Sequence, residues 1–240
     1  REVKLSFRGI NWKKHIVHTR ITYLISITYG VTLLLDNVLL RMMSTEAAVA
    51  FYALPMKIAR TFTALLTDSL LVFFPKIVSY LKENKTEWAQ DALLKNLRML
   101  IFFGVPVSIG LFLVSEQLIA VFLGDQFLPA ITNLQILAFF PILRAYNLFL
   151  CKQILVTHNR EKLYLVSLTA SGLLFVVLIL ALSSNYADRG ACYAMMATEV
   201  FMLGLNYYYA RKTAAGLQLF DSKALWQACL SGLLVVPVVY

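Results

Sequence analysis

The stretch YGVTLLLDNVLLRMMSTEAAVAFYALPMKIARTFTALLTDSLLVFFPKIVSYLK, residues 29–82, decides the fold. It contains two apolar segments joined by a short polar connection. The first segment carries Asp36, and the second carries Lys57, Arg60, Asp68 and Lys76. Charged side chains at membrane depth need partners or a water-filled cavity. The stretch therefore predicts a polar pathway inside a helical membrane protein.

The composition of the whole chain is that of an integral membrane protein. Its 240 residues are 60% hydrophobic and 15% charged, and the mean hydropathy is +0.71, well above the apolar share of soluble domains. Long apolar runs with short polar connections favour an all-α transmembrane bundle, whereas a barrel would show alternating segments of about ten residues. Because the chain begins without Met and ends inside an apolar run, we expect it to be part of a longer protein.

Six membrane spans and the start of a seventh are predicted. The second is longer than the roughly 20 residues needed to cross a bilayer, so it must tilt, protrude or break near Pro55 or Pro75. We expect a basic cytoplasmic lead-in (1–18), a six-helix transmembrane lobe (19–210), a cytoplasmic loop (211–224) and a truncated helix (225–240). The six spans are 19–40, 49–81, 97–114, 130–156, 163–182 and 191–210.

The distribution of Lys and Arg predicts the orientation. The stretches 1–14, 82–98, 157–163 and 211–223 contain 14 of them, whereas the alternate connections contain only Arg41 and Arg189. Cytoplasmic loops carry such an excess of basic residues, so the first set is placed in the cytoplasm. The net charge of +9 then reflects topology and anionic headgroups, and no nucleic-acid partner is expected.

Four of the spans carry a polar stripe at helical spacing. At 100° per residue, Lys57, Arg60 and Asp68 lie on one narrow face of the second span. The fifth span lacks such a stripe and is predicted to face lipid. The other three stripes are Thr22, Ser26, Tyr29 and Asp36 on the first span; Arg144, Asn147 and Cys151, with Lys152 beside them, on the fourth; and Glu199, Met202 and Asn206 on the sixth.

Two interpretations of the charged residues are open. Fixed positive charge in a shared hollow would favour an anionic group such as a phosphate or diphosphate. Alternatively, Asp36 could pair with Arg60 and Glu199 with Arg144, and each pair would then only lock one helix against another.

Other kinds of site have weaker signals. Asp36, Asp68 and Glu199 are candidates for proton or cation coupling, because desolvated carboxylates can titrate near neutral pH. No nucleotide-binding loop is present, so no cofactor is expected. His15 and His18 share a helix face without a third ligand, and no metal site is predicted. The cysteines, at 151, 192 and 229, are interpreted as packing residues.

The run LLLDNVLLRMMSTEAAVAFYALPMKIARTFTALLTDSLLVFFPKIVSYLKE resembles the seventh and eighth helices of polysaccharide (O-antigen type) flippases. These belong to the multidrug/oligosaccharidyl-lipid/polysaccharide exporter superfamily. The shared pattern is an Asp near the outer end of one helix, a short loop, an aromatic-Tyr-Ala stretch and an inner Pro. The later runs GVPVSIGLFLVSEQLIAVFLGDQFLPA and YADRGACYAMMATEV are similar to the ninth and twelfth helices, so the resemblance covers about residues 1–215.

The resemblance implies that this chain forms the second lobe of a two-lobed exporter, facing a missing N-terminal lobe across a cavity of alternating access. The implied substrate is an undecaprenyl-diphosphate-linked oligosaccharide in the inner membrane of a bacterium. Lys57, Arg60, Arg144 and Lys152 would bind its diphosphate, while groups such as Tyr29 and Asn147 would meet its sugars. Further implied partners are membrane lipids and, as an additional candidate, glycan polymerase machinery.

Three alternatives to a flippase are considered. A drug or cation antiporter of the same superfamily would have a more acidic cavity. A membrane-embedded glycan polymerase or ligase would carry a large periplasmic loop with catalytic Arg or His, but each outward connection predicted here is shorter than about ten residues. A non-transporting scaffold would tolerate neutralisation of Arg60 together with Asp36. We expect a transporter rather than an enzyme.

Overall fold

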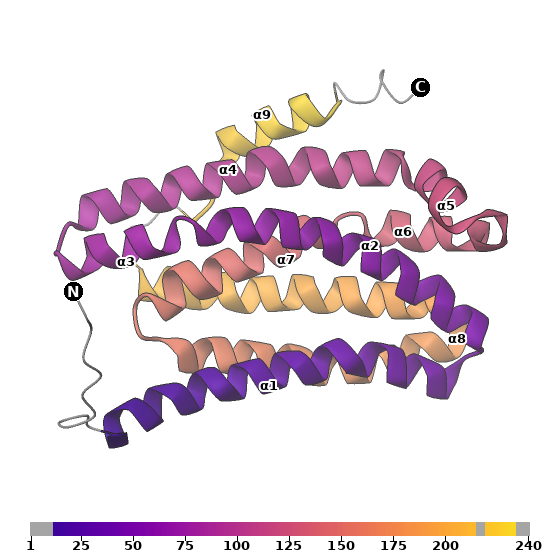
Figure 1. Ribbon diagram of the computed structural model, residues 1–240, viewed down its shortest axis with the longest axis horizontal. Helices are drawn as coiled ribbons and strands as arrows, with labels where there is room; N and C mark the ends of the chain where they lie inside the picture. Colours follow the sequence, from indigo (N-terminus) through magenta and orange to yellow (C-terminus); the bar gives the residue numbers. More distant parts are fainter. Residues whose placement is uncertain (1–11, 215–218, 234–240) are drawn as a thin grey trace, which may run out of the picture.

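The computed structural model describes residues 12–214 and 219–233, and within these ranges it is helical, with no strand (Figure 1). The predicted all-α transmembrane class is confirmed. In chain order the elements are α1 (Trp12–Met43), α2 (Glu46–Leu71), α3 (Phe74–Lys82), α4 (Thr86–Leu113), α5 (Ser115–Leu123), the 3₁₀ helix η1 (Asp125–Ala130), α6 (Ile131–Leu137), α7 (Phe140–Leu148), the π-helical segment η2 (Phe149–Val156), α8 (Glu161–Thr213) and α9 (Ser222–Leu233).

Five helical stretches of the described chain are long and apolar enough to cross a membrane. They comprise 19–43, 46–82, 86–113, 125–156 and 161–213. The last has 53 residues, more than twice the roughly 20 needed for one crossing. It folds back on itself at Ala187, so the described residues form six long helical arms, and α9 follows them as the helix predicted after residue 224.

The reversal of α8 occurs at Ala187, whose φ of 47° and ψ of −122° are not helical. It divides α8 into a first arm, 161–186, and a second arm, 188–213. A methyl group at Gly190 would overlap the backbone of Leu182 on the other arm, so only glycine fits there. At the same end, Asn133 of α6 donates hydrogen bonds to Asp188 and to the carbonyl of Phe51. These contacts fix the hairpin against α2 and α6.

The long second span breaks at Pro75 and not at Pro55. Pro55 lies buried inside an unbroken α2, whereas Pro75 lies in the first turn of α3. The first turn is the position where the missing N–H of proline costs no hydrogen bond. The carbonyl of Leu70, near the break, accepts side-chain hydrogen bonds from Gln153 at 2.9 Å and Asn96 at 3.3 Å, in addition to one from the Phe73 N–H. This buried amide pair therefore holds the break of α2 against α4 and η2.

Four clusters of buried side chains hold the described spans together, and two of them are large. One joins α2, α3, α4, α7, η2, the end of α8 and α9, and includes Leu97 and Ile77. The other joins α1, α2, α6, α7 and both arms of α8, and includes Tyr52 and Phe175. Between these clusters, α1 and α2 diverge along much of their length, and α1 packs mainly on α8 (Figure 1).

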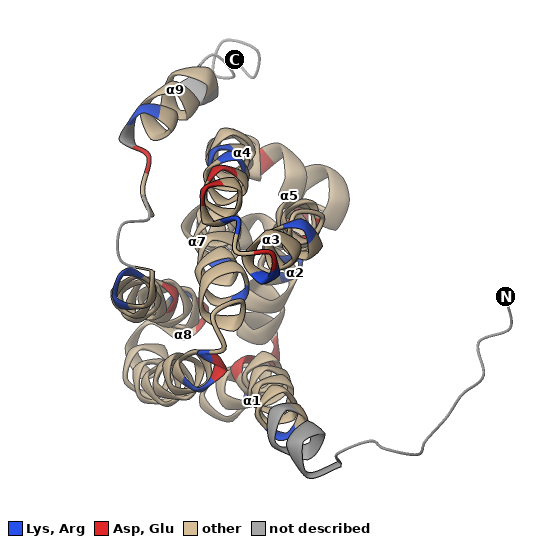
Figure 2. Ribbon diagram, turned by 90° about the vertical axis from the view of Figure 1, so that its left-hand side faces the viewer, with Lys and Arg blue, Asp and Glu red and all other residues tan. Residues whose placement is uncertain are grey.

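Basic residues gather at one end of the bundle, where α3 meets α4 and where α8 begins and ends (Figure 2). This arrangement agrees with the asymmetry of Lys and Arg along the sequence. Arg98 of α4 binds Asp221, just before α9, at 2.8 Å. The hydrogen bond from Arg98, followed by the N–H of Ala224, lowers the pKa of the Asp221 carboxyl. The predicted lead-in lies mostly outside the described residues, as does the end of the last helix.

Candidate substrate and ion site

Two adjacent hollows lie between α1, α2, α7, η2 and α8. The mid-bundle cavity has a volume of about 260 Å³ and is lined by Arg60, Arg144 and Glu199, among others. The end cavity, towards the basic end of the bundle, has a volume of about 560 Å³ and is lined by Asp68 and Lys152, among others. The two cavities share Tyr29, Thr67 and Leu148 as lining residues. Hollows with charged and hydroxyl groups in an otherwise apolar lining thus lie among the spans.

The first ion pair of the mid-bundle cavity joins α1 to α2. Asp36 is fully buried, and its Oδ2 lies 2.6 Å from Arg60 Nη2. The same oxygen accepts a hydrogen bond from the Tyr52 hydroxyl at 3.2 Å, and Asn37 donates to Oδ1. The Arg60 side chain remains 32% exposed, and its Nε has no hydrogen-bond partner. Arg60 therefore faces the cavity while its carboxylate partner lies behind it.

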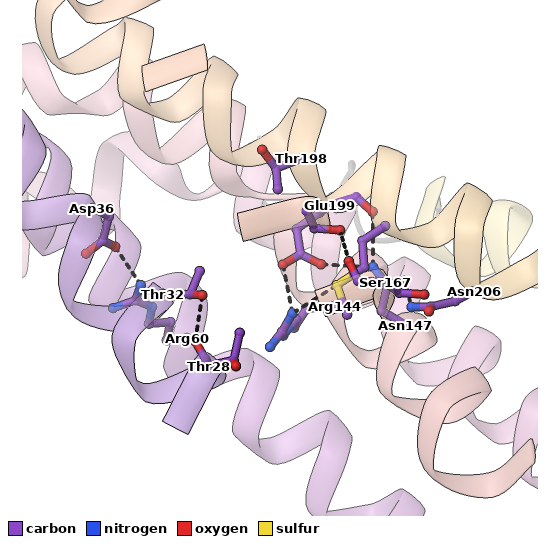
Figure 3. A network of polar contacts seen from close by, with 12 residues as sticks. Thr28, Thr32, Asp36, Arg60, Arg144, Asn147, Ser167, Thr198, Glu199 and Asn206 are labelled. Carbon is purple, nitrogen blue, oxygen red and sulfur yellow. Dashed lines mark hydrogen bonds and ion pairs between the residues drawn. The ribbon is translucent and has the colours of Figure 1, made fainter. Parts of the chain in front are cut away.

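The second ion pair joins α7 to α8 and is more deeply buried (Figure 3). Arg144 Nη1 lies 3.0 Å from Glu199 Oε1, and the two side chains are 8% and 7% exposed. Asn147 donates to Glu199 Oε2 at 2.9 Å, and Asn206 donates to Asn147 Oδ1 at 2.9 Å. The Arg144 guanidinium also lies 4.8 Å from the centre of the Tyr29 ring, which is within the range of a cation–π interaction.

The structure places the predicted site residues in different environments. Tyr29, Arg60, Arg144 and Glu199 line the mid-bundle cavity, and Asp68 and Lys152 line the end cavity. Lys57 is exposed and lines neither cavity, although it shares a helix face with Arg60. Asp36 and Asn147 are buried and line neither cavity, but they hydrogen-bond to the lining residues Arg60 and Glu199. The cavities therefore collect six of the nine residues predicted for substrate binding or coupling.

Both ion pairs of the alternative interpretation are present, and they change the charge of the hollow. In the mid-bundle cavity each guanidinium has its own carboxylate. In the end cavity the lining contains one base, Lys152, and two acids, Asp68 and Glu161. Among the described residues, Lys152 has no carboxylate within ion-pair distance. The described lining therefore has no excess of positive charge, and Lys152 is its unpaired base.

Several lining residues escaped the sequence analysis. The fifth span was predicted to face lipid, but Ser171 and Gly172 of the first arm of α8 line the mid-bundle cavity, so the prediction is wrong for that face. The exposed face carries Val166, Leu173 and Val177. The available signal was the pair Ser167 and Ser171, one helical turn apart. Within 12–214 and 219–233, no group of three His, Cys, Asp or Glu could hold a metal ion.

The geometry defines a class: an all-α, multi-pass membrane protein with a polar hollow among its spans. Residues 22–132 match the family described as "Polysaccharide biosynthesis protein". Over 147 residues, the chain is 28% identical to a "Putative O-antigen transporter" of Escherichia coli (strain K12). This alignment covers 61% of the chain and 35% of the relative, so the chain spans about a third of the relative's length. No solved structure gives a significant match.

These comparisons support the recognition made from the sequence. Over these residues the chain is similar to polysaccharide, or O-antigen, transport-type membrane proteins.

Proposed function

We propose that the protein containing this chain is a flippase that moves an undecaprenyl-diphosphate-linked oligosaccharide across the bacterial inner membrane by alternating access. The observation that carries the proposal is the hollow itself, in which Arg60, Arg144 and Lys152 occur at membrane depth beside many hydroxyl groups. A lipid tail can remain in the bilayer, but a glycan head group needs such a polar path. The relation to an O-antigen transporter supports the same substrate class.

Within this proposal, Lys152 is the first base to meet the diphosphate. It lines the larger cavity, towards the end of the bundle that we assign to the cytoplasm, and it is not neutralised by a carboxylate. An unpaired ammonium attracts phosphate as a point charge. Arg60 and Arg144 lie deeper and are already paired, so a phosphate would have to compete with Asp36 and Glu199 for them.

The three predicted coupling residues differ in their access to the hollow. Asp68 faces the end cavity directly. Asp36 and Glu199 are held by Arg60 and Arg144, so they can exchange a proton only when these pairs separate. We propose that Asp68 can take up a proton or cation from the end cavity directly. Asp36 and Glu199 can do so only after their ion pairs with Arg60 and Arg144 have separated. The test replaces all three acids with their neutral amides. If the ion and pH dependence of transport were then unchanged, Asp36, Asp68 and Glu199 would have no role in coupling.

A cation antiporter is the second candidate function. One observation favours it: the two acids and one base of the end cavity, Asp68, Glu161 and Lys152. The two guanidinium groups of the mid-bundle cavity oppose it, because they repel a cation. For a glycan polymerase or ligase the described residues give no support. On the side opposite the basic end, the α1–α2 connection and the α8 reversal are only a few residues long, and the connection from α4 to α6 is taken up by α5 and η1.

Complementation of a flippase-deficient bacterial strain by the complete protein tests the proposal. We expect Lys152→Ala and Arg60→Ala to reduce surface glycan strongly, with lipid-linked oligosaccharide accumulating in the cytoplasmic leaflet. Arg41→Ala, which changes an exposed base outside both cavities, is the matched control. Lys57→Ala tests whether that exposed base has the role predicted from the sequence. Normal surface glycan with both Lys152→Ala and Arg60→Ala would exclude the proposed role of the hollow.

A further inference from the structure

The Thr and Ser hydroxyl groups of the mid-bundle cavity, as distinct from the Tyr29 phenol, share one hydrogen-bonding pattern. Each donates its hydrogen to a backbone carbonyl three or four residues earlier in its own helix, at distances of 2.7–3.1 Å. A hydroxyl has one donor and two acceptor lone pairs, so only its acceptor capacity is left for the cavity. The lining residues with this pattern are Thr32, Thr63, Thr67, Ser171 and Thr198.

The donors of the same cavity are charged but balanced. Arg60 and Arg144 supply N–H groups, and each is paired with a carboxylate. Asp36 engages only Nη2 of Arg60, and that side chain remains 32% exposed, although its Nε is itself buried. A guanidinium has five N–H donors, so both arginines can donate further hydrogen bonds without losing their carboxylates.

This combination of groups disfavours an ion as the ligand. An anion would face hydroxyl acceptors and would have to compete with Asp36 and Glu199. A bare cation would face two guanidinium groups. The volume also argues against a bare cation, because about 260 Å³ is several times the roughly 30 Å³ that one water occupies in the liquid. A neutral group with many donors and acceptors satisfies both sets of lining groups.

We propose that the mid-bundle cavity is a subsite for an uncharged sugar residue of the transported oligosaccharide. The sugar hydroxyls donate to the lining Thr and Ser oxygens and accept from Arg60 and Arg144. This inference rests on the proposed flippase function and deepens it. It puts the glycan deeper in the hollow than the diphosphate, which stays near Lys152 in the end cavity.

Binding measurements on the complete purified protein in lipid nanodiscs test the subsite. The probes are the repeat-unit oligosaccharide, released by mild acid and free of lipid and phosphate, and separately inorganic pyrophosphate and NaCl. Loss of one hydrogen-bond acceptor corresponds to roughly a three- to tenfold loss of affinity. We expect Thr198→Val and Ser171→Ala each to weaken oligosaccharide binding by this factor and to leave pyrophosphate binding unchanged.

Two control variants separate a lost acceptor from a disturbed fold. Thr169→Val changes a hydroxyl of the same helix that also donates to a carbonyl four residues earlier, but it is exposed and lies outside both cavities. It should bind the oligosaccharide like the wild type. Thr198→Ser keeps the hydroxyl and should restore most of the affinity that Thr198→Val loses.

Three outcomes would overturn the subsite. They are equal oligosaccharide affinity in all variants, loss of pyrophosphate binding with Thr198→Val, or loss of sodium binding with unchanged oligosaccharide binding. The flippase function is measured separately by translocation of the wild-type protein. A wild type that translocates, with cavity variants that bind the oligosaccharide normally, would reject the subsite and keep the function.

Discussion

The Glu199 carboxylate on α8 lies 3.0 Å from the Arg144 guanidinium on α7, and both side chains are almost fully buried. Because 55 positions separate them in the chain, their meeting depends on the packing of α7 against the second arm of α8. The interaction of Asn147 with both the side chain and the backbone carbonyl of Glu199 fixes the same register. The pair thus ties two walls of the mid-bundle cavity together.

Removal of one partner of this pair should cost more stability than removal of both. Glu199→Gln leaves the Arg144 charge buried without its counterion, which typically costs about 3–5 kcal/mol. The double variant Arg144→Met, Glu199→Leu should recover much of that loss. Chemical unfolding of the detergent-solubilised protein measures both, and a double variant less stable than Glu199→Gln would contradict the prediction.

The α8 hairpin should be intolerant of a side chain at Gly190. Gly190→Ala places a methyl group against the Leu182 backbone, which cannot move as a flexible side chain can. We expect a loss of stability of a few kcal/mol, within the range of overpacking changes. Gly204→Ala is the matched control in the same helix, because no atom lies within 4 Å of the added carbon. That control should be neutral or stabilising by up to about 1 kcal/mol, and equal effects of the two variants would contradict the prediction.

The break between α2 and α3 should depend on the buried amide of Asn96. Asn96→Leu removes a donor to the Leu70 carbonyl and leaves the Gln153 side-chain oxygen, 2.7 Å away, without that partner. An unsatisfied buried group costs about 1–3 kcal/mol. Gln90→Leu, an exposed amide on the same helix, should have little effect. Hydrogen exchange over residues 66–80 should rise only in Asn96→Leu, and unchanged exchange would exclude this role.

Docking of α9 should be insensitive to pH in the neutral range. Arg98 lowers the pKa of the Asp221 carboxyl. The stabilisation of α9 docking by this ion pair is therefore complete above the ordinary aspartate pKa of about 3.9, and it is lost as the pH falls through the lower pKa of the folded state. The distance between spin labels on α4 and α9 should therefore stay constant from about pH 5 to 8. Arg98→Ala should widen its distribution, whereas Lys95→Ala, which breaks an exposed pair within α4, should not. A transition near neutral pH would contradict the assignment.

Local properties of the sequence determined the all-α membrane class and the approximate extents of the apolar segments, and they limited a break of the second span to Pro55 or Pro75. Hydropathy, segment length and proline geometry depend only on residues within a few helical turns, so they can be predicted without knowing the contacts between distant segments. The pairs Asp36–Arg60 and Glu199–Arg144 were also available from the sequence as one of two interpretations, because buried charges need partners. Whether those partners were carboxylates or a substrate could not be read from spacing.

Tertiary structure alone decided which polar groups share the hollow. Lys57 and Arg60 lie on one narrow helix face, yet Lys57 is exposed and Arg60 lines a cavity. The angular position of a residue around its own helix does not specify where the neighbouring helices lie. The packing of α1 and of the two α8 arms against α2 and α7 sets that position. The same packing brings Ser171 into the cavity and pairs each deep arginine with an acid, because the burial of charge and hydroxyls depends on contacts between distant segments.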